Sequence, residues 1–295
     1  MSDQAIVLNE LSKHYGKHRG INHLTFSVNS GEFFGFIGPN GAGKSTTIRT
    51  LMGLIRPTGG SASIFGLDCR TKASVIAKDV GYLPSENSYY ENMKVRELLQ
   101  YTADLYSMDC KVKMNELSDR LNLDLSRRIA DLSLGNKKKV GIVSAIMVSP
   151  KLIIMDEPTS GLDPLIQQSF YDILKEENSR GVTIFFSSHV LSEVQKLCDR
   201  VAILKEGQLI GIQSIKELRE SGYKKVSLRA KNVISRDFFD LPGIANYTET
   251  ADQTSVSFLY NGNITAVIDK IHLLSLDDVL LEDPSLEEIF MHYYE

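Results

Sequence analysis

A glycine-rich segment between two apolar segments is the feature that most constrains how this chain can fold. Residues 38–46 read Gly-Pro-Asn-Gly-Ala-Gly-Lys-Ser-Thr and directly follow the apolar run of residues 33–37. Apolar residues then recur at helical spacing from Ile48 to Ile55, ahead of Pro57. This order predicts a buried strand, a tight loop and a helix in direct succession.

The glycine-rich loop has the residue types that phosphate binding requires. Glycines let a backbone turn tightly and direct several N–H groups at one centre, which also faces the positive end of the following helix. Lys44 adds a charge that can reach the β- and γ-phosphates of a nucleotide, and the Ser45 hydroxyl is a hard oxygen ligand suited to Mg²⁺. The alternative is a chance glycine-rich turn. We expect a nucleotide site made by Gly38, Pro39, Asn40, Gly41, Ala42, Gly43, Lys44, Ser45 and Thr46.

Two acids, Asp156 and Glu157, follow a second apolar strand at residues 152–155. Open α/β sheets place their ligands at the carboxyl ends of such strands. Asp156 is suited to hold Mg²⁺ through water, and Glu157 to orient and polarise the attacking water in phosphoryl transfer. The alternative is a solvated acidic loop after a core strand. For an acid pair taken alone, the two interpretations are about equally well supported. The upstream phosphate loop favours the catalytic interpretation.

Two aromatic residues complete the candidate site. His189 follows the apolar strand of residues 182–186, so it could donate a hydrogen bond to the γ-phosphate from a neighbouring strand end. A lone histidine is more often structural. Tyr15 has a ring that could stack on adenine, although surface packing is the interpretation that the sequence alone favours for it.

The order of apolar segments predicts an α/β protein. Strand-like and helical segments alternate up to about residue 211, which favours a mixed, mainly parallel sheet with helices on both faces. Past about residue 219 two alternating strands and a helix at residues 264–273 predict a small α+β domain. Residues 93–122 have helical spacing, and the inner face is expected to hold Val95, Leu98, Leu99 and Leu105.

Composition excludes several classes of protein. The chain of 295 residues is 42% hydrophobic and 24% charged with a net charge of −4, so it is globular and has no nucleic acid as an expected partner. Three scattered cysteines argue against a disulfide framework or zinc site. The N-terminus lacks a signal-peptide pattern. The longest apolar run, residues 140–148, is far shorter than the roughly 20 residues of a membrane span.

These residues, in this order, resemble the nucleotide-binding domain of ATP-binding cassette (ABC) proteins over about residues 5–211. Residues 38–46 match Walker A and residues 152–156 match Walker B, with Glu157 after it. Residues 160–163, Ser-Gly-Leu-Asp, resemble the D-loop, which ends at Asp163. His189 resembles the switch histidine. Residues 132–136, Leu-Ser-Leu-Gly-Asn, resemble the signature.

The resemblance implies a P-loop NTPase core with a mixed, mainly parallel sheet, an antiparallel β subdomain and a helical subdomain. The expected bounds are residues 1–218 for the nucleotide-binding domain, with its helical part at about residues 87–148. Residues 219–295 are the expected C-terminal α+β accessory domain, which regulates, dimerises or simply stabilises the fold.

The resemblance also implies a head-to-tail dimer, either homodimer or heterodimer. Ser133, Gly135 and Asn136 of one protomer would meet the ATP of the other. The residue types agree, because Ser133 can cap a helix that begins near Lys137 and faces an anion. The three lysines at residues 137–139 are expected to form a solvated helix face rather than a nucleic-acid patch.

Three positions depart from the family pattern. Leu134 stands where the signature usually has Gly, and Asn136 where it has Gln. Ser85 stands where the Q-loop Gln normally ligates Mg²⁺ and follows the membrane partner. Ser85 is too short to do both, so it is kept as a candidate metal ligand beside water or Glu86 as substitutes.

The resulting functional hypothesis is a transport ATPase. The tail at residues 281–290 resembles the ending of bacterial subunits that pair with separately encoded exporter permeases. We expect MgATP hydrolysis at a dimer interface to drive export through a multi-span permease, with the chain in the cytoplasm on the inner face of the cell membrane. A translation- or repair-related ABC ATPase, or a regulator without turnover, is the alternative. A single cassette argues against a translation factor, and the lack of long heptad repeats argues against a repair protein. The presence of Glu157 and His189 argues against a regulator without turnover.

Overall fold

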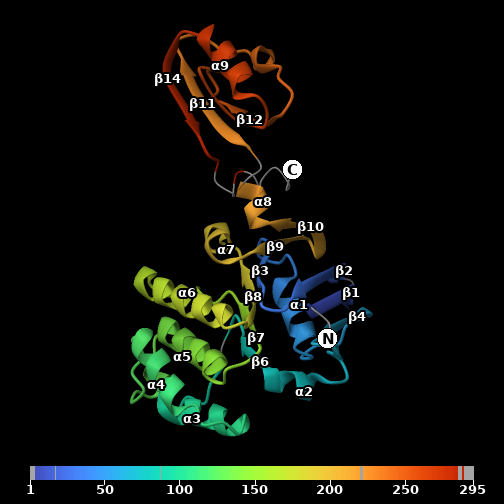
Figure 1. Cartoon of the computed structure of the whole chain (residues 1–295), viewed down its shortest axis with the longest axis vertical. Helices are drawn as coiled ribbons and strands as arrows, with labels where there is room; N and C mark the ends of the chain where they lie inside the picture. The colour runs from blue at the N-terminus through green and yellow to red at the C-terminus, as the bar shows by residue number, and fades with distance from the viewer. Residues whose placement is uncertain (1–3, 17, 87, 220–221, 285–287, 289–295) are drawn as a thin grey trace. The chain divides into compact units, whose positions relative to one another are not determined.

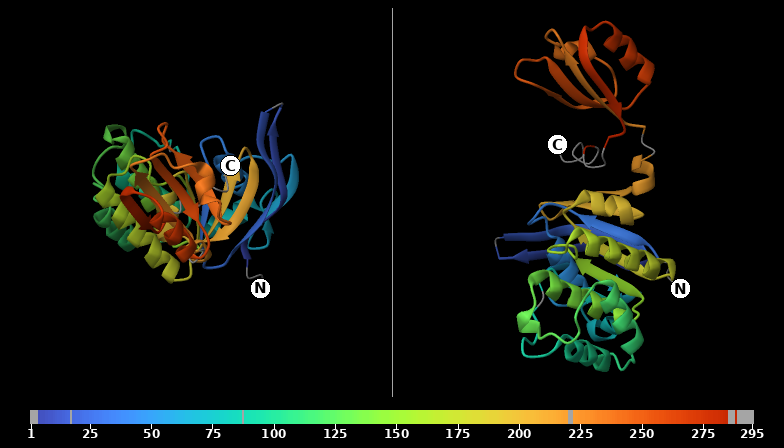
Figure 2. Two further views of the ribbon diagram at one scale, coloured as in Figure 1. Left: turned by 90° about the horizontal axis from the view of Figure 1, so that it is seen from above. Right: turned by 90° about the vertical axis from the view of Figure 1, so that its left-hand side faces the viewer.

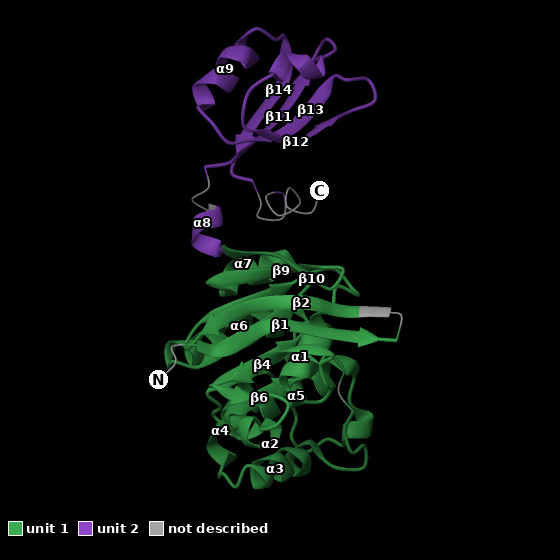
Figure 3. Ribbon diagram, turned by 90° about the vertical axis from the view of Figure 1, so that its right-hand side faces the viewer, with its two compact units in different colours: residues 1–213 green, residues 214–295 purple. Residues whose placement is uncertain are grey.

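The computed structural model describes residues 4–16, 18–86, 88–219, 222–284 and 288. The chain divides into two compact units, Met1–Gln213 and Ser214–Glu295 (Figure 3). The boundary therefore lies at residues 213/214, slightly before the expected 218/219. Of the C-terminal segment 281–290 that resembles exporter subunits, residues 285–287 and 289–290 lie outside the described part.

A six-stranded sheet forms the centre of the first unit (Figure 1). Its order is β10-β9-β3-β8-β7-β6, and the pairs β3–β9, β3–β8, β7–β8 and β6–β7 are all parallel. Because the strands of these pairs run in the same direction, the loops that follow them meet at one edge. The strands are β3 (Phe33–Ile37), β6 (Val80–Leu83), β7 (Leu152–Asp156), β8 (Thr183–Ser188), β9 (Arg200–Lys205) and β10 (Gln208–Ser214).

An antiparallel sheet with the order β2-β1-β4-β5 belongs to the same unit. The strand β1 pairs with both β2 and β4. The sheet therefore confirms the antiparallel β part of the predicted fold class. Its strands are β1 (Gln4–Tyr15), β2 (His18–Asn29), β4 (Gly59–Ile64) and β5 (Leu67–Asp68).

Helices lie on both faces of the central sheet. Figures 1 and 2 place α1 and the antiparallel sheet on one side and α3, α4, α5 and α6 on the other. These helices are α1 (Lys44–Leu51), α2 (Ala73–Ile76), α3 (Val95–Leu105), α4 (Lys111–Arg120), α5 (Leu134–Met147), α6 (Pro164–Ser179) and α7 (Leu191–Leu197). Short 3₁₀ turns occur at Ala77–Asp79 and Ile129–Asp131. None of the described helices is long and apolar enough to cross a membrane.

Two helical predictions were wrong in detail. The helix expected near Lys137 begins at Leu134, because Ser133 already caps it there. Leu105 was expected on the inner face of residues 93–122, but it is 66% exposed at the last position of α3. Val95, Leu98 and Leu99 are buried as expected.

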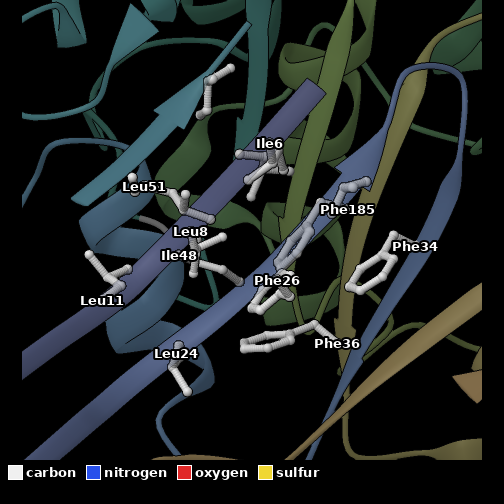
Figure 4. Close-up of a cluster of buried hydrophobic side chains, with 14 of the residues drawn as sticks. Ile6, Leu8, Leu11, Leu24, Phe26, Phe34, Phe36, Ile48, Leu51 and Phe185 are labelled. Atoms are coloured by element: carbon white, nitrogen blue, oxygen red, sulfur yellow. The ribbon is translucent and has the colours of Figure 1, made fainter. Parts of the chain in front are cut away.

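Aromatic side chains join the two sheets of the first unit (Figure 4). The ring of Phe34 on β3 stacks on those of Phe26 of β2 and Phe185 of β8. The ring centres are 5.7 Å and 5.8 Å apart, respectively. Ile48 and Leu51 of α1 belong to the same buried cluster. The helix after the glycine-rich loop is therefore fixed between the two sheets by apolar burial, and its first turn is fixed with it.

The second unit is an α+β fold with an antiparallel sheet in the order β12-β13-β11-β14. Val226, Leu228 and Phe258 point into its core together with Val267 of α9. The alternation expected for the tail is confirmed at these positions. The elements are α8 (Ile215–Arg219), β11 (Lys224–Ala230), a 3₁₀ turn (Arg236–Phe239), β12 (Ile244–Glu249), β13 (Ser255–Tyr260), α9 (Ile264–His272) and β14 (Leu276–Glu282).

Candidate nucleotide-binding and hydrolytic site

The glycine-rich loop connects β3 to α1 and is held close to β9. A Cβ atom on Gly38 would lie 2.3 Å from the backbone oxygen of Leu204, so no side chain fits there. Gly43 occupies the N-cap of α1 with φ of 107°, a conformation that L side chains rarely adopt. Glycine at these two positions is therefore a steric requirement of the loop.

Lys44 is the first residue of α1 and is only 5% exposed. Its ammonium donates hydrogen bonds to the backbone oxygens of Gly38 at 2.7 Å and Pro39 at 3.3 Å. It also lies 3.1 Å from Glu157 Oε1. The lysine side chain therefore folds back over its own loop and meets the acid that follows β7.

A cavity of about 230 Å³ opens above this loop. Glu157 and Tyr15 contribute to it, and the ammonium of Lys13 lies 5.2 Å from the centre of the Tyr15 ring. Gly38 and Pro39 are not part of its lining, and their carbonyl oxygens accept hydrogen bonds from Lys44. The full lining is Tyr15, Gly20, Asn40, Gly41, Ala42, Gly43, Lys44, Ser45, Thr46 and Glu157.

The acid pair is positioned by the neighbouring strand β8. Asp156 is the register partner of Ser187, whose hydroxyl donates to Asp156 Oδ1 at 2.7 Å. The backbone N–H of Glu157 donates to the carbonyl and the hydroxyl oxygens of Ser187, at 3.2 and 3.1 Å. These bonds hold Glu157 at φ of 49°. The positive φ turns its backbone out of the strand direction just as the chain leaves the sheet.

Asp156 is fully buried, and its Oδ2 atom has no hydrogen-bond partner among the residues that the structure describes. A buried carboxylate oxygen without a donor is unfavourable unless a cation or an ordered water binds it. Burial, reinforced by the charge of Asp156, also raises the pKa of Tyr82 to about 12. The geometry therefore leaves one carboxylate oxygen for an external ligand.

His189 lies directly beside Glu157. Its Nδ1 atom is 3.0 Å from Glu157 Oε2. The preceding residue, Ser188, donates to the buried carboxylate of Glu193 at 2.7 Å, and Tyr171 donates to the same carboxylate at 3.0 Å. The prediction that His189 follows a neighbouring strand of β7 is confirmed by the β7–β8 pairing. Its contact is with Glu157, which the sequence did not predict.

The signature and D-loop residues meet each other outside the cavity. Ser133 caps α5 by accepting a hydrogen bond from the Asn136 N–H at 3.4 Å, as predicted. A Cβ atom on Gly135 would lie 2.5 Å from the backbone oxygen of Gly161. Asp163 caps α6, accepting from the Ile166 N–H at 3.1 Å. Ser133, Gly135, Asn136 and Asp163 do not line the cavity in the described part of the chain.

The prediction that residues 137–139 form a solvated lysine face was wrong for two of the three lysines. Lys138 is 4% exposed and Lys139 is 7% exposed. Lys138 donates to the backbone oxygen of Ser85 at 2.8 Å. Burial lowers the pKa of Lys138, and the nearby carboxylates of Asp156 and Glu157 oppose that shift. A run of lysines suggests a solvated helix face. The sequence does not reveal that Lys138 is covered by the segment that contains Ser85.

Ser85, the candidate metal ligand, is half-buried and does not line the cavity in the described part of the chain.

Ser187 is a residue of the site that the sequence analysis did not single out. Its proximity to the acids depends on β7 and β8 being neighbours, and the sequence signal was limited to two serines before His189.

The chain matches known proteins over this site. A family model described as ABC transporter matches residues 21–160. The bacitracin transport ATP-binding protein BcrA of Bacillus licheniformis is 37% identical over 211 residues, which cover 70% of this chain and 68% of that protein. The ABC transporter ATP-binding protein YhaQ of Bacillus subtilis is 32% identical over 295 residues, 97% of each chain.

Solved structures give the same assignment. An ATP-binding subunit of an ABC transporter superposes with a TM-score of 0.68 at 32% identity, covering 73% of this chain and 92% of that one. A dimeric bacterial ABC transporter cassette has a TM-score of 0.66 at 22% identity, covering 71% and 98% respectively, which shows the shared fold. The chain belongs to the ATP-binding proteins of ABC transporters. It is an ATP-binding subunit and an ATPase of that family.

Proposed function

We propose that two protomers bind MgATP between them and that hydrolysis powers export of a substrate through a multi-span membrane permease. One observation carries the proposal: Lys44 and Glu157 face a single cavity, 3.1 Å apart, at the edge where the strands of the central sheet end. A cation for phosphates and an acid for water are then within reach of one nucleotide.

Tyr15 and the loop residues are the proposed nucleotide ligands. Backbone N–H groups of residues 40–46 and the start of α1 favour a polyphosphate in the cavity. A bound phosphate would compete with Glu157 for the Lys44 ammonium. Tyr15, 46% exposed at the rim, offers its ring to a base.

The residues present fit a magnesium ion. Asp156 has a buried oxygen without a donor, and Ser45 lies at the start of the helix that faces the cavity. Hard oxygen ligands of this kind, with water and phosphate oxygens completing the shell, suit Mg²⁺. When bound, the ion neutralises charge on the transferring phosphoryl group. Ser85 is a weaker candidate, because its backbone oxygen accepts from Lys138 and the residue does not line the cavity.

Glu157 is the proposed residue that orients and polarises the attacking water. Its carboxylate is 23% exposed, and its two oxygens contact Lys44 and His189. These contacts restrict the direction in which the carboxylate points, and such positioning is what makes an acid effective in phosphoryl transfer. His189 holds one oxygen of Glu157 and is the proposed hydrogen-bond donor to the γ-phosphate.

The signature residues Ser133, Gly135 and Asn136 are proposed to meet the nucleotide of a second protomer. They lie outside the cavity of their own chain, and the start of α5 presents N–H groups suited to an anion. Asp163 belongs to the same interface in this proposal. The partner is a second copy or a related subunit, and the dimeric bacterial cassette with the same fold supports the arrangement.

Export is the proposed direction of transport, and the inner face of the cell membrane the proposed location. The similarity to a bacitracin transport ATP-binding protein supports a role in transport. The test is to look for a multi-span membrane protein encoded beside the gene and to co-express it with the tagged chain. The membranes are then extracted with detergent, and copurification and ATP hydrolysis are measured. We expect a stable complex whose ATPase rate exceeds that of the chain alone. Lys44→Ala should keep the complex and lose the ATPase. Failure to retain any multi-span protein would contradict the transport proposal.

A further inference from the structure

His189 lies in a two-residue loop between β8 and α7. Ser188 is the last residue of β8 and Leu191 is the first of α7, so His189 and Val190 connect the two elements. The His189 side chain is 49% exposed, and its Nδ1 atom lies 3.0 Å from Glu157 Oε2. A half-exposed ring has few neighbours to pack against, so its direction depends on how firmly the backbone of this loop is held.

The hydroxyl of Ser188 closes that loop. It accepts a hydrogen bond from the Val190 N–H at 2.9 Å, across His189. A hydroxyl has one proton to donate. The acceptors within reach are Glu193 Oε2 at 2.7 Å and the Val190 backbone oxygen at 3.3 Å, and the shorter contact with the carboxylate is the stronger of the two. Glu193 therefore determines where the Ser188 hydroxyl points, and with it how the loop is closed.

Glu193 is a buried acid that joins three elements of the fold. It is the third residue of α7 and is 7% exposed. Its second carboxylate oxygen, Oε1, accepts a hydrogen bond from the hydroxyl of Tyr171 on α6 at 3.0 Å. Both helices pack against β8. Because a buried carboxylate oxygen that loses its donor is unfavourable, Glu193 resists any movement that breaks either bond.

We propose that Glu193 is a positioning residue of the ATPase site, which holds the His189 loop in place through the hydroxyl of Ser188. The inference rests on the proposed function, in which His189 contacts Glu157 and the γ-phosphate. Continuous contacts lead from Glu193 to the cavity: its carboxylate holds Ser188 at 2.7 Å, and the next residue, His189, lies 3.0 Å from Glu157. A displacement of about 1 Å can cost about 100-fold in rate. Loosening the loop should therefore lower kcat although Glu193 does not line the cavity in the described part of the chain.

Glu177 provides a matched control near the opposite end of β8. It is 4% exposed, and its backbone oxygen accepts from the Val182 N–H, one residue before β8 begins. Its carboxylate contacts Lys113 at 3.0 Å and Arg180 at 2.9 Å. Glu177→Met and Glu193→Met therefore each remove a buried acid that has two partners. Only the second releases the loop that carries the proposed γ-phosphate donor.

The experiment compares Glu193→Met, Glu193→Gln, Ser188→Ala and Glu177→Met with the wild-type full-length chain, each with His189 and with His189→Ala. Steady-state ATP hydrolysis gives kcat and KM, and single-turnover hydrolysis with excess protein extends the measurement to slow variants. For Glu193→Met and Ser188→Ala we expect kcat to fall about 10- to 100-fold. KM should change less than about threefold, because the phosphate loop is untouched. Glu193→Gln keeps an acceptor for one hydroxyl and should recover part of kcat.

The His189→Ala background separates positioning from packing. If Glu193 acts through His189, its replacement should lower kcat by less than about twofold once His189 is absent. Hydrogen exchange of the peptide that contains Val190 reports on the loop itself. Exchange there should rise in Glu193→Met and Ser188→Ala and stay at the wild-type level in Glu177→Met.

An unchanged kcat in folded Glu193→Met, or in Ser188→Ala, would overturn the proposal. So would an equal loss in Glu177→Met, or a loss of the same size with and without His189. His189→Ala by itself tests the proposed function. If it hydrolyses ATP at the wild-type rate, the assigned role of His189 fails. If it is slow while Glu193→Met is fully active, the positioning role alone fails.

Discussion

Lys44 Nζ lies 3.1 Å from Glu157 Oε1, so the cation of the phosphate loop and the acid after β7 form an ion pair across the cavity. The lysine is 5% exposed and the acid 23%. At such burial the pair is weakly screened by solvent. In the proposed function, a nucleotide that enters the cavity would compete with Glu157 for Lys44, so binding and catalysis would use the same contact.

Replacing Glu157 by Gln should separate these two functions. The variant keeps the shape of the side chain but removes its charge and its capacity as a base. We expect kcat to fall about 10²- to 10⁴-fold. The affinity for ATP should be equal or higher, since Lys44 loses its competing carboxylate. Steady-state kinetics and equilibrium binding of a fluorescent ATP analogue measure the two effects. Hydrolysis at the wild-type rate would refute the assigned role of Glu157.

The hydroxyl of Ser187 should matter to both stability and activity. In Ser187→Ala, the buried carboxylate of Asp156 loses the hydroxyl that donates a hydrogen bond to its Oδ1 atom. We expect the free energy of unfolding to fall by about 1–3 kcal/mol and kcat to decrease, because the Glu157 N–H keeps its bond to the Ser187 carbonyl oxygen alone. Urea unfolding and ATPase assays test this. Ser169→Ala, at a half-buried site on α6 where the hydroxyl donates to the Leu165 backbone oxygen of the same helix, should change neither quantity.

Gly38 should not accept a side chain. The added Cβ of Gly38→Ala would lie 2.3 Å from the Leu204 backbone oxygen, so the loop must move away from β9. We expect a loss of about 1–3 kcal/mol in the free energy of unfolding and weaker ATP binding, because the N–H groups no longer converge. Gly211→Ala is the control, since its nearest atom would be 3.9 Å away. Equal ATP affinity in the two variants would contradict this view of the loop.

The contact between α4 and α6 should depend on pH. Arg120 binds Glu176 through two hydrogen bonds of 2.6 and 2.7 Å, which lower the pKa of Glu176 below its ordinary value of 4.5. A carboxyl group whose pKa is lower in the folded state stabilises the fold above pH 4.5, and this contribution disappears as the pH falls through the lowered pKa.

Glu176→Gln should therefore cost about 0.5–1 kcal/mol at pH 7, a small value because the side chain is 47% exposed. The difference from wild type should shrink as the pH falls below 4.5. Urea unfolding at a series of pH values measures it. Glu116→Gln, whose carboxylate lies 3.9 Å from Arg120, should have a smaller effect at pH 7. A difference that grows in acid would have the wrong sign for this mechanism.

Local patterns in the sequence predicted much of the site. Three features depend only on neighbours within a few positions: the loop of residues 38–46, the acids after residues 152–155 and the cap at Ser133. Their chemistry could therefore be predicted from the sequence without knowledge of the fold. The strand–helix alternation likewise predicted the α/β class. Leu105 was misplaced because its spacing fits the inner face, while its position at the end of α3 leaves it exposed.

By itself, then, the sequence predicted which groups could bind phosphate and which acids follow a buried strand. The tertiary structure alone decided which groups meet. Lys44 reaches Glu157, Ser187 reaches Asp156 and Lys138 reaches Ser85 because β3, β8, β7 and β6 are neighbours in the sheet and α5 packs against β6. Strand order is set by burial of apolar surface among segments far apart in the chain, and no local pattern encodes it.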